Sequence, residues 1–245
     1  MSHDFDIEPG LTIGEWLYAE VSEAAVIETD GWAPERVNRV LARLQLVRQG
    51  RPPLRGVVPW LPAFTAFTAP GDYVYFGRRL LERMPDDATA AFVLAHEVAH
   101  HDLGHTKLFP DWLMRAARRR GGVILVALWP GLERRLYGPE RECDADRYAV
   151  ELCVAAGYVA NECLEFFRIM AMICLDLGDR AIVFGPDPDS DQELAPTAPW
   201  LTKARIWAWQ RTRGYLPLTD REAMTRAHLA ALRSGTATNR ALSPA

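Results

Sequence analysis

The sequence has very little lysine. Of its 28 basic residues only Lys107 and Lys203 are lysines, and the others are arginines. It contains no phosphate-binding glycine loop followed by lysine, and no serine stands in a nucleophile elbow. The formal net charge of −4 also argues against binding to nucleic acid. These absences exclude the P-loop enzymes, the serine hydrolases of that type and the basic nucleic-acid-binding proteins.

Long apolar segments are missing as well. The longest one, Gly121 to Leu132, is shorter than the about 20 residues that a membrane-spanning helix needs. The N-terminal stretch MSHDFDIEPG is acidic and lacks the basic start and apolar core of a signal peptide. We therefore expect a cytoplasmic protein whose four cysteines, which form no CxxC pair, are free thiols.

A peripheral membrane contact is an alternative that this region leaves open. Basic side chains precede the apolar run, and together they could attach to an anionic membrane surface. A buried helix with solvated arginines is the simpler interpretation. The residues concerned are Arg115, Arg118, Arg119 and Arg120.

The length of 245 residues and the content of 49% hydrophobic residues fit a single globular domain. Residues 57–76 are rich in aromatic and β-branched side chains around a Pro-Gly-Asp turn, which predicts a β-hairpin; its prolines favour the edge of a sheet. We expect an α+β fold that is predominantly helical, with loose tails at 1–10 and 234–245 and a flexible loop at 185–200. That loop is either a linker or a cover for a cleft. Helical spacing of apolar residues marks 12–29, 34–48, 88–104, 140–156, 159–177, 200–212 and 219–233.

The stretch LAHEVAHHDLGH at 94–105 holds four of the six histidines. Successive helical residues are about 100° apart around the axis, so His96 and His100 share one face with Glu97 beside them. This is the HExxH arrangement, in which two imidazoles bind zinc and the glutamate lies next to the bound water. His101 and His105 lie elsewhere on the helix, and we interpret them as a solvent-side or helix-end pair.

A catalytic zinc site needs a third protein ligand. His105 does not fit the HExxHxxGxxH spacing, because glycine stands at 104 rather than at 103. In GPERECDADRYAVELC, Glu142 and Asp146 are four residues apart and share a helix face. Glu142 is the candidate third ligand, and Asp146 would accept the second N–H of a ligating histidine. The alternative is a solvated, acidic start of a helix.

These motifs and their order resemble the HtpX and CAAX prenyl endopeptidase group of zinc metallopeptidases, which are gluzincins. The resemblance covers roughly 35–210 and includes ERVNRVLARL, AFTAPGDYVYFGRRLL, AAFVLAHEVAHHDLGH and ECDADRYAVELCVAAGY. It implies a zincin-like core with a small hairpin beside the active-site helix. It also implies one zinc ion held by His96, His100 and Glu142, with Glu97 as the general base.

The chain departs from the family pattern at its late arginine-containing helix. Many members have a histidine before a proline there, whereas this sequence has Ala198, followed by Arg205 roughly at the arginine's position. Arg205 or a tyrosine such as Tyr148 is the candidate donor to the oxyanion. The missing histidine keeps a second function open, namely a catalytically weak or idle zinc-stabilised module that binds peptides or proteins.

The predicted hairpin also suggests where a substrate would bind. An unpaired edge strand can accept an extended peptide as an additional strand. The groove candidates are Phe67, Tyr73, Tyr75 and Phe76, of which we expect about half to belong to the core instead. We take Phe67 and Tyr73 as the substrate-binding residues. The function predicted from the sequence is hydrolysis of peptide bonds by a zinc metalloendopeptidase.

Overall fold

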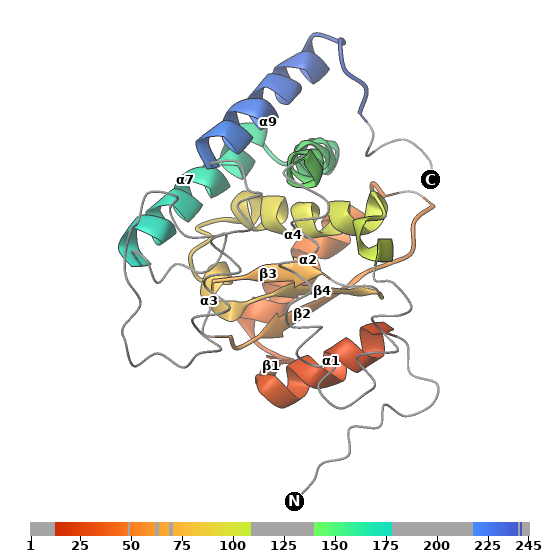
Figure 1. The fold of residues 1–245 in the computed structure, drawn as a ribbon, viewed down its shortest axis with the longest axis vertical. Coiled ribbons are helices and arrows are strands. Elements are labelled where there is room, and N and C mark those ends of the chain that lie inside the picture. Colours follow the sequence, from red (N-terminus) through yellow and green to blue (C-terminus); the bar gives the residue numbers. More distant parts are fainter. Residues whose placement is uncertain are drawn as a thin grey trace, which may run out of the picture.

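The computed structural model describes residues 13–48, 50–61, 64–68, 71–108, 140–177, 218–239 and 241. Its centre is a four-stranded sheet with helices on both faces (Figure 1). Helices predominate, so the predicted α+β class is confirmed. Within the described part of the chain, no helix is both long enough and apolar enough to cross a membrane.

The sheet has the strand order β1-β2-β4-β3. Strand β4 pairs antiparallel with β3 and parallel with β2, and β1 pairs antiparallel with β2. The predicted hairpin is therefore confirmed as β3 and β4. Among the described strands, the expectation that this region forms an edge holds for β3 but is wrong for β2 and β4, which each have a neighbour on both sides. The strands are β1 (Ile27–Glu28), β2 (Arg55–Pro59), β3 (Ala66–Thr68) and β4 (Tyr73–Phe76).

Pro59 does not prevent the central position of β2, because it falls at the end of that strand. Pro59 is the last residue of β2, opposite Ile27 of the short strand β1. A proline in the middle of a central strand would remove a ladder hydrogen bond, whereas one at the end of a strand is tolerated.

The helices form layers on the sheet. Helices α2 and α4 pack on one face, and α7 packs on the far side of α4 (Figure 1). Helix α1 lies against the other face, where Tyr18 stacks on Tyr73 with ring centroids 5.1 Å apart. The labelled helices are α1 (Ile13–Ala24), α2 (Trp32–Gln45), α3 (Arg78–Leu81), α4 (Asp87–Asp102), α7 (Ala160–Leu177) and α9 (Leu218–Arg233), and a further helix covers 140–155.

Helix α4 is the centre of the core. Every residue from Ala88 to Ala99 is buried, which is the pattern of a helix packed on all sides. Asp86 caps its N-terminus by accepting a hydrogen bond of 2.8 Å from the backbone N–H of Thr89. The histidine motif therefore lies on a helix whose position is fixed by its surroundings.

Several predicted segments lie outside the described residues. These are the tail at 1–10, the loop at 185–200, the helix at 200–212 and the basic and apolar region at 112–132, with Arg115 to Arg120. Among the described cysteines, Cys143, Cys153 and Cys163 are free and buried.

Candidate metal centre

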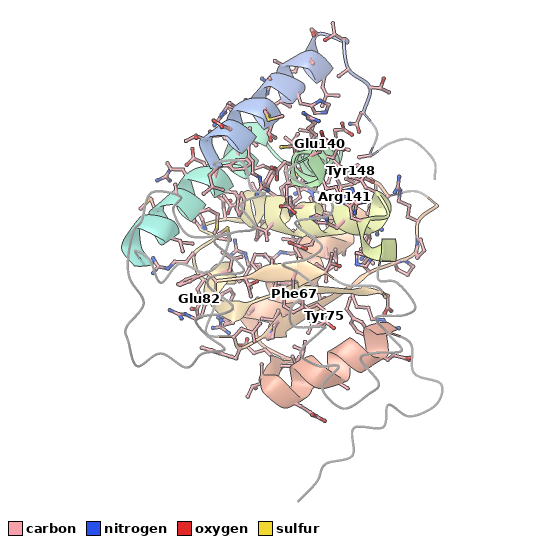
Figure 2. All side chains as sticks on the ribbon, viewed as in Figure 1. Phe67, Tyr75, Glu82, Glu140, Arg141 and Tyr148 are labelled. Atoms are coloured by element: carbon pink, nitrogen blue, oxygen red, sulfur yellow. The ribbon has the colours of Figure 1, made fainter. Side chains whose placement is uncertain are left out.

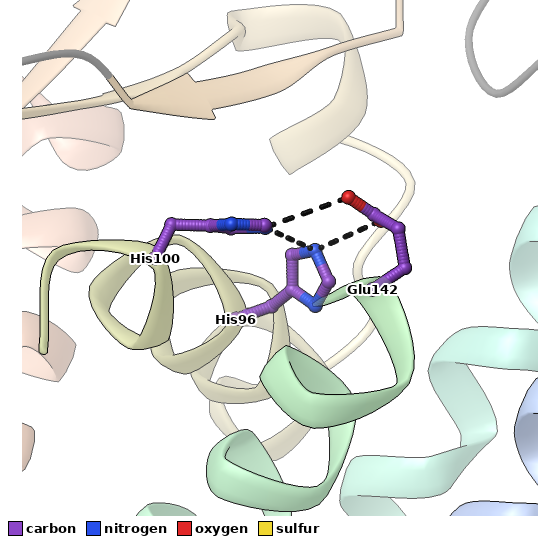
Figure 3. A group of neighbouring side chains, drawn as sticks. All are labelled: His96, His100 and Glu142. Carbon is purple, nitrogen blue, oxygen red and sulfur yellow. Dashed lines mark hydrogen bonds and ion pairs between the residues drawn. The ribbon is translucent and has the colours of Figure 1, made fainter. Parts of the chain in front are cut away.

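Two elements bring three ligand atoms together. His96 and His100 lie one turn apart near the C-terminal end of α4, and Glu142 lies in the first turn of the described part of the helix over 140–155 (Figure 3). The Nε2 atoms of the two imidazoles are 3.2 Å apart. The Glu142 carboxylate lies 3.5 Å from Nε2 of His96 through Oε2 and 3.7 Å from Nε2 of His100 through Oε1.

These separations suit a tetrahedral zinc site. Ligand atoms about 2.0–2.1 Å from a zinc ion are about 3.3 Å from each other. The donor set of two imidazoles and one carboxylate is that of a catalytic zinc, which keeps its fourth position for water or substrate. Among the described residues, this is the one group of three such side chains whose ligand atoms converge.

Asp146 fixes the orientation of the His96 ring. Its Oδ1 lies 3.0 Å from Nδ1 of His96, and its side chain is fully buried. When Nδ1–H donates to this carboxylate, Nε2 is left with a lone pair that faces His100 and Glu142. Glu142 and Asp146 thus lie on one helix face, as the spacing of four predicts.

His105 contacts the other histidine of the pair. Its Nδ1 lies 3.0 Å from Nδ1 of His100, whose Nε2 faces His96. His105 therefore lies just past the end of α4, as the helix-end alternative expects, but it contacts His100 rather than His101. His105 can contact His100 because α4 ends at Asp102 and the chain reverses at Gly104, which has a φ of 74°.

His101 is not paired with His105 either. Its Nε2 forms a hydrogen bond with Oγ1 of Thr68 in β3, the edge strand of the described sheet. Burial lowers the pKa of His101, which keeps the ring neutral near pH 7. His101 therefore connects the metal-site helix to the edge strand.

Glu97 is buried on α4, with 8% of its surface exposed. It follows His96 directly and precedes His100 by three residues, so it belongs to the part of the helix that carries both imidazoles. A carboxylate can act as a general base when it lies within hydrogen-bond reach of the proton that it abstracts.

The charges of the three candidate ligands depend on one another. Burial disfavours the charged form of His96, but its hydrogen bonds to Asp146 and Glu142 outweigh burial and raise its pKa to about 10. Burial and the charge on His96 lower the pKa of His100 to about 3. Burial opposes ionisation of Glu142, yet the hydrogen bond to His96 and the charge of Arg221 hold its pKa well below the usual range. Binding of a metal ion would therefore release a proton from His96.

Arg221 is a site residue that the sequence analysis missed. It lies in α9, is 2% exposed, and donates to both oxygens of Asp146 at 2.7 and 2.8 Å. The available signal was its position: Arg221, Thr225 and Leu229 recur every four residues and form the buried face of α9. A charged side chain on such a face needs a buried partner of opposite charge.

Of the two candidate donors to the oxyanion, the structure describes only Tyr148. Arg205 lies outside the described residues. Tyr148 is 1% exposed, and its hydroxyl donates to Oδ2 of Asp102 at 2.7 Å. The hydroxyl proton of Tyr148 is therefore already used in the hydrogen bond with Asp102.

The structure does not bring Phe67 and Tyr73 to the ligands. Side chains alternate between the two faces of a strand. Val74 and Phe76 belong to the core shared with α4, whereas Tyr73 stacks on α1 and Phe67 stacks on Tyr75 with centroids 4.6 Å apart (Figure 2). Their rings thus lie on the sheet face turned away from α4.

Comparison with known proteins assigns the family. The model of peptidase family M48 matches residues 29–212, which is most of the chain. The protein therefore belongs to peptidase family M48, a family of metallopeptidases. No curated protein matches the sequence.

Proposed function

We propose that the protein is a zinc-dependent endopeptidase with His96, His100 and Glu142 as the metal ligands. The observation that carries this proposal is the convergence of these three side chains from two separate helices at distances of 3.2–3.7 Å. Membership of family M48 supports it. Within that family, the sequence motifs favour the HtpX and CAAX prenyl endopeptidase group.

The proposed reaction uses one residue of α4 for proton transfer. A zinc ion held at this site would lower the pKa of a water molecule towards 7 and polarise the peptide carbonyl. Glu97 takes a proton from the attacking water and delivers it to the leaving amine when the C–N bond breaks. Asp146 keeps the His96 ring in the orientation that presents Nε2 to the ligand position.

We also propose that the substrate peptide binds along β3. Within the described sheet β3 is an edge strand, and an extended peptide can pair with such an edge through main-chain hydrogen bonds. Strand β3 packs against α4, and Thr68 of β3 is hydrogen bonded to His101, the neighbour of His100. A peptide on this edge would therefore run beside the metal ligands.

Glu97→Gln tests the proposal, since the amide keeps the shape of the side chain but takes up no proton. We expect the variant to bind one zinc ion per chain and to lose cleavage of unfolded casein by a factor of at least about 10². Glu165→Gln, at an ion pair with Arg168 on the surface of α7, is the matched control and should cleave normally. Cleavage that persists in the Glu97 variant would refute the assigned base.

A catalytically idle zinc-binding module is the second candidate, because Ala198 replaces the histidine that many relatives carry. If the protein is such a module, the wild type should contain zinc and bind peptides without cleaving them. Mass spectrometry of a peptide library before and after incubation separates the two functions: new peptide termini that disappear with Glu97→Gln support the peptidase.

A further inference from the structure

Helix α9 lies beyond the segment that the family model matches. The match ends at residue 212, and α9 begins at Leu218. Yet α9 packs on the part of the molecule that carries the metal site, because it contacts α7 and its Met224 sulfur lies 3.9 Å from the Cys143 sulfur, next to Glu142. A segment outside the family match therefore covers the helix that supplies the third ligand.

The guanidinium group of Arg221 contacts two acidic residues of this ligand helix. Nε donates to Oδ2 of Asp146 at 2.7 Å and Nη2 donates to Oδ1 at 2.8 Å, so both carboxylate oxygens are held in a planar fork. Nη2 also lies 3.5 Å from Oε2 of Glu142. Both carboxylates also contact His96: Oδ1 of Asp146 lies 3.0 Å from its Nδ1, and Oε2 of Glu142 lies 3.5 Å from its Nε2, the atom that faces the metal position.

We propose that Arg221 is a positioning residue of the metal centre, which orients the Glu142 ligand and, through Asp146, the His96 ligand. The inference rests on the proposed zinc site and adds a residue from outside the family match to it. Arg221 itself does not contact substrate, since it is 2% exposed and its fork is occupied by Asp146. It acts by restricting the rotation of two carboxylates whose directions decide where a metal ion can bind.

A second ion pair on α9 serves as a control that distinguishes two roles of this helix: positioning of the metal ligands and simple attachment to the ligand helix. Nε2 of His228 lies 2.6 Å from Oε1 of Glu151, which is fully buried in the helix over 140–155. Oε2 of Glu151 accepts a hydrogen bond of 3.0 Å from the backbone N–H of Ala241. This pair attaches the C-terminal region to the same helix as Arg221 does, but neither His228 nor Glu151 belongs to the group of converging ligands.

The experiment compares Arg221→Gln and Arg221→Lys with His228→Gln in the full-length protein. Zinc affinity is measured by competition with a chromophoric chelator, and the visible spectrum of the cobalt-substituted protein reports the ligand geometry. We expect zinc affinity to fall about 10–100-fold in Arg221→Gln, with a changed cobalt spectrum. Arg221→Lys should lie between that variant and wild type, because lysine keeps the charge but not the planar fork.

His228→Gln should lower the melting temperature while its zinc affinity and cobalt spectrum remain those of wild type. Equal zinc affinity in wild type and in the folded Arg221 variants would overturn the inference, and so would an equal loss in His228→Gln. If Arg221→Gln does not fold, the zinc affinity of Arg221→Lys tests the inference instead, since lysine keeps a cation beside Asp146. A wild-type protein that binds neither zinc nor cobalt would overturn the proposed function itself.

Discussion

Asp102 connects three elements around the metal site, and its replacement by asparagine has a predictable cost. Arg48 donates to both of its oxygens at 2.9 and 2.7 Å, and the hydroxyl of Tyr148 donates at 2.7 Å. Arg48 follows α2, Asp102 ends α4, and Tyr148 lies on the helix that carries Glu142. The contact therefore helps to hold together the two helices that carry the candidate ligands.

The magnitude follows from the burial of the pair. The side chains of Arg48 and Asp102 are only 2% and 4% exposed. Asp102→Asn leaves the Arg48 cation buried without its charged partner, and breaking a buried pair in this way costs about 3–5 kcal/mol. For a chain of this size each kcal/mol lowers the melting temperature by about 2–4 °C. We therefore expect a decrease of about 6–20 °C.

Thermal unfolding followed by circular dichroism measures this decrease, and its pH dependence provides a second check. Burial opposes ionisation of Asp102, but the hydrogen bonds and charge of Arg48 prevail and lower its pKa. A group with a lowered folded-state pKa stabilises the fold above its unfolded value of about 3.9 and loses this effect as the pH falls through the folded value. The difference between wild type and Asp102→Asn should thus be constant from pH 5 to 8 and narrow below about pH 4.

The control for Asp102→Asn is Glu165→Gln, which breaks an ion pair of 2.6 Å between two largely exposed side chains. Such pairs contribute about 0–1 kcal/mol, so its melting temperature should fall by no more than about 4 °C. If Asp102→Asn destabilises the protein no more than this control, the buried pair does not hold the helices as we infer.

Two further predictions concern the metal. Removal of zinc by a chelator should lower the melting temperature: zinc at 100 times its dissociation constant adds about 2.7 kcal/mol of stability, equivalent to about 5–11 °C in a scanning calorimeter. Glu142→Ala should not respond to zinc in this way, and a response like that of wild type would exclude Glu142 as a ligand. His105→Ala should weaken zinc binding about tenfold in chelator competition, since His100 loses the contact at its Nδ1, whereas His228→Ala should not. Unchanged affinity in His105→Ala would mean that this contact does not orient His100.

Local periodicity was sufficient for the features of the site that lie on a single helix. Four-residue spacing placed His96 with His100, and Glu142 with Asp146, because the geometry of an α-helix is the same in any protein. The buried helix α4 and the hairpin of β3 and β4 were likewise evident from apolar patterns and turn residues.

Spacing alone did not reveal where the chain reverses after a helix. His105 is off the ligand face on a continuous helix, but α4 ends at Asp102 and Gly104 turns the chain back to His100. The parallel pairing of β2 with β4 was missed for a similar reason. It depends on which strands meet in space, and strand sequences carry little information about their neighbours.

The sequence by itself determined the chemistry of this protein: two imidazoles and a glutamate on one helix, and two carboxylates on another. Tertiary structure decided how these groups meet and what holds them. The distance of 3.5 Å between His96 and Glu142, and the burial of Arg221 against Asp146, arise from the packing of α4, α9 and the helix over 140–155. Contacts between distant segments depend on the whole core, whereas contacts within a helix depend only on its repeat.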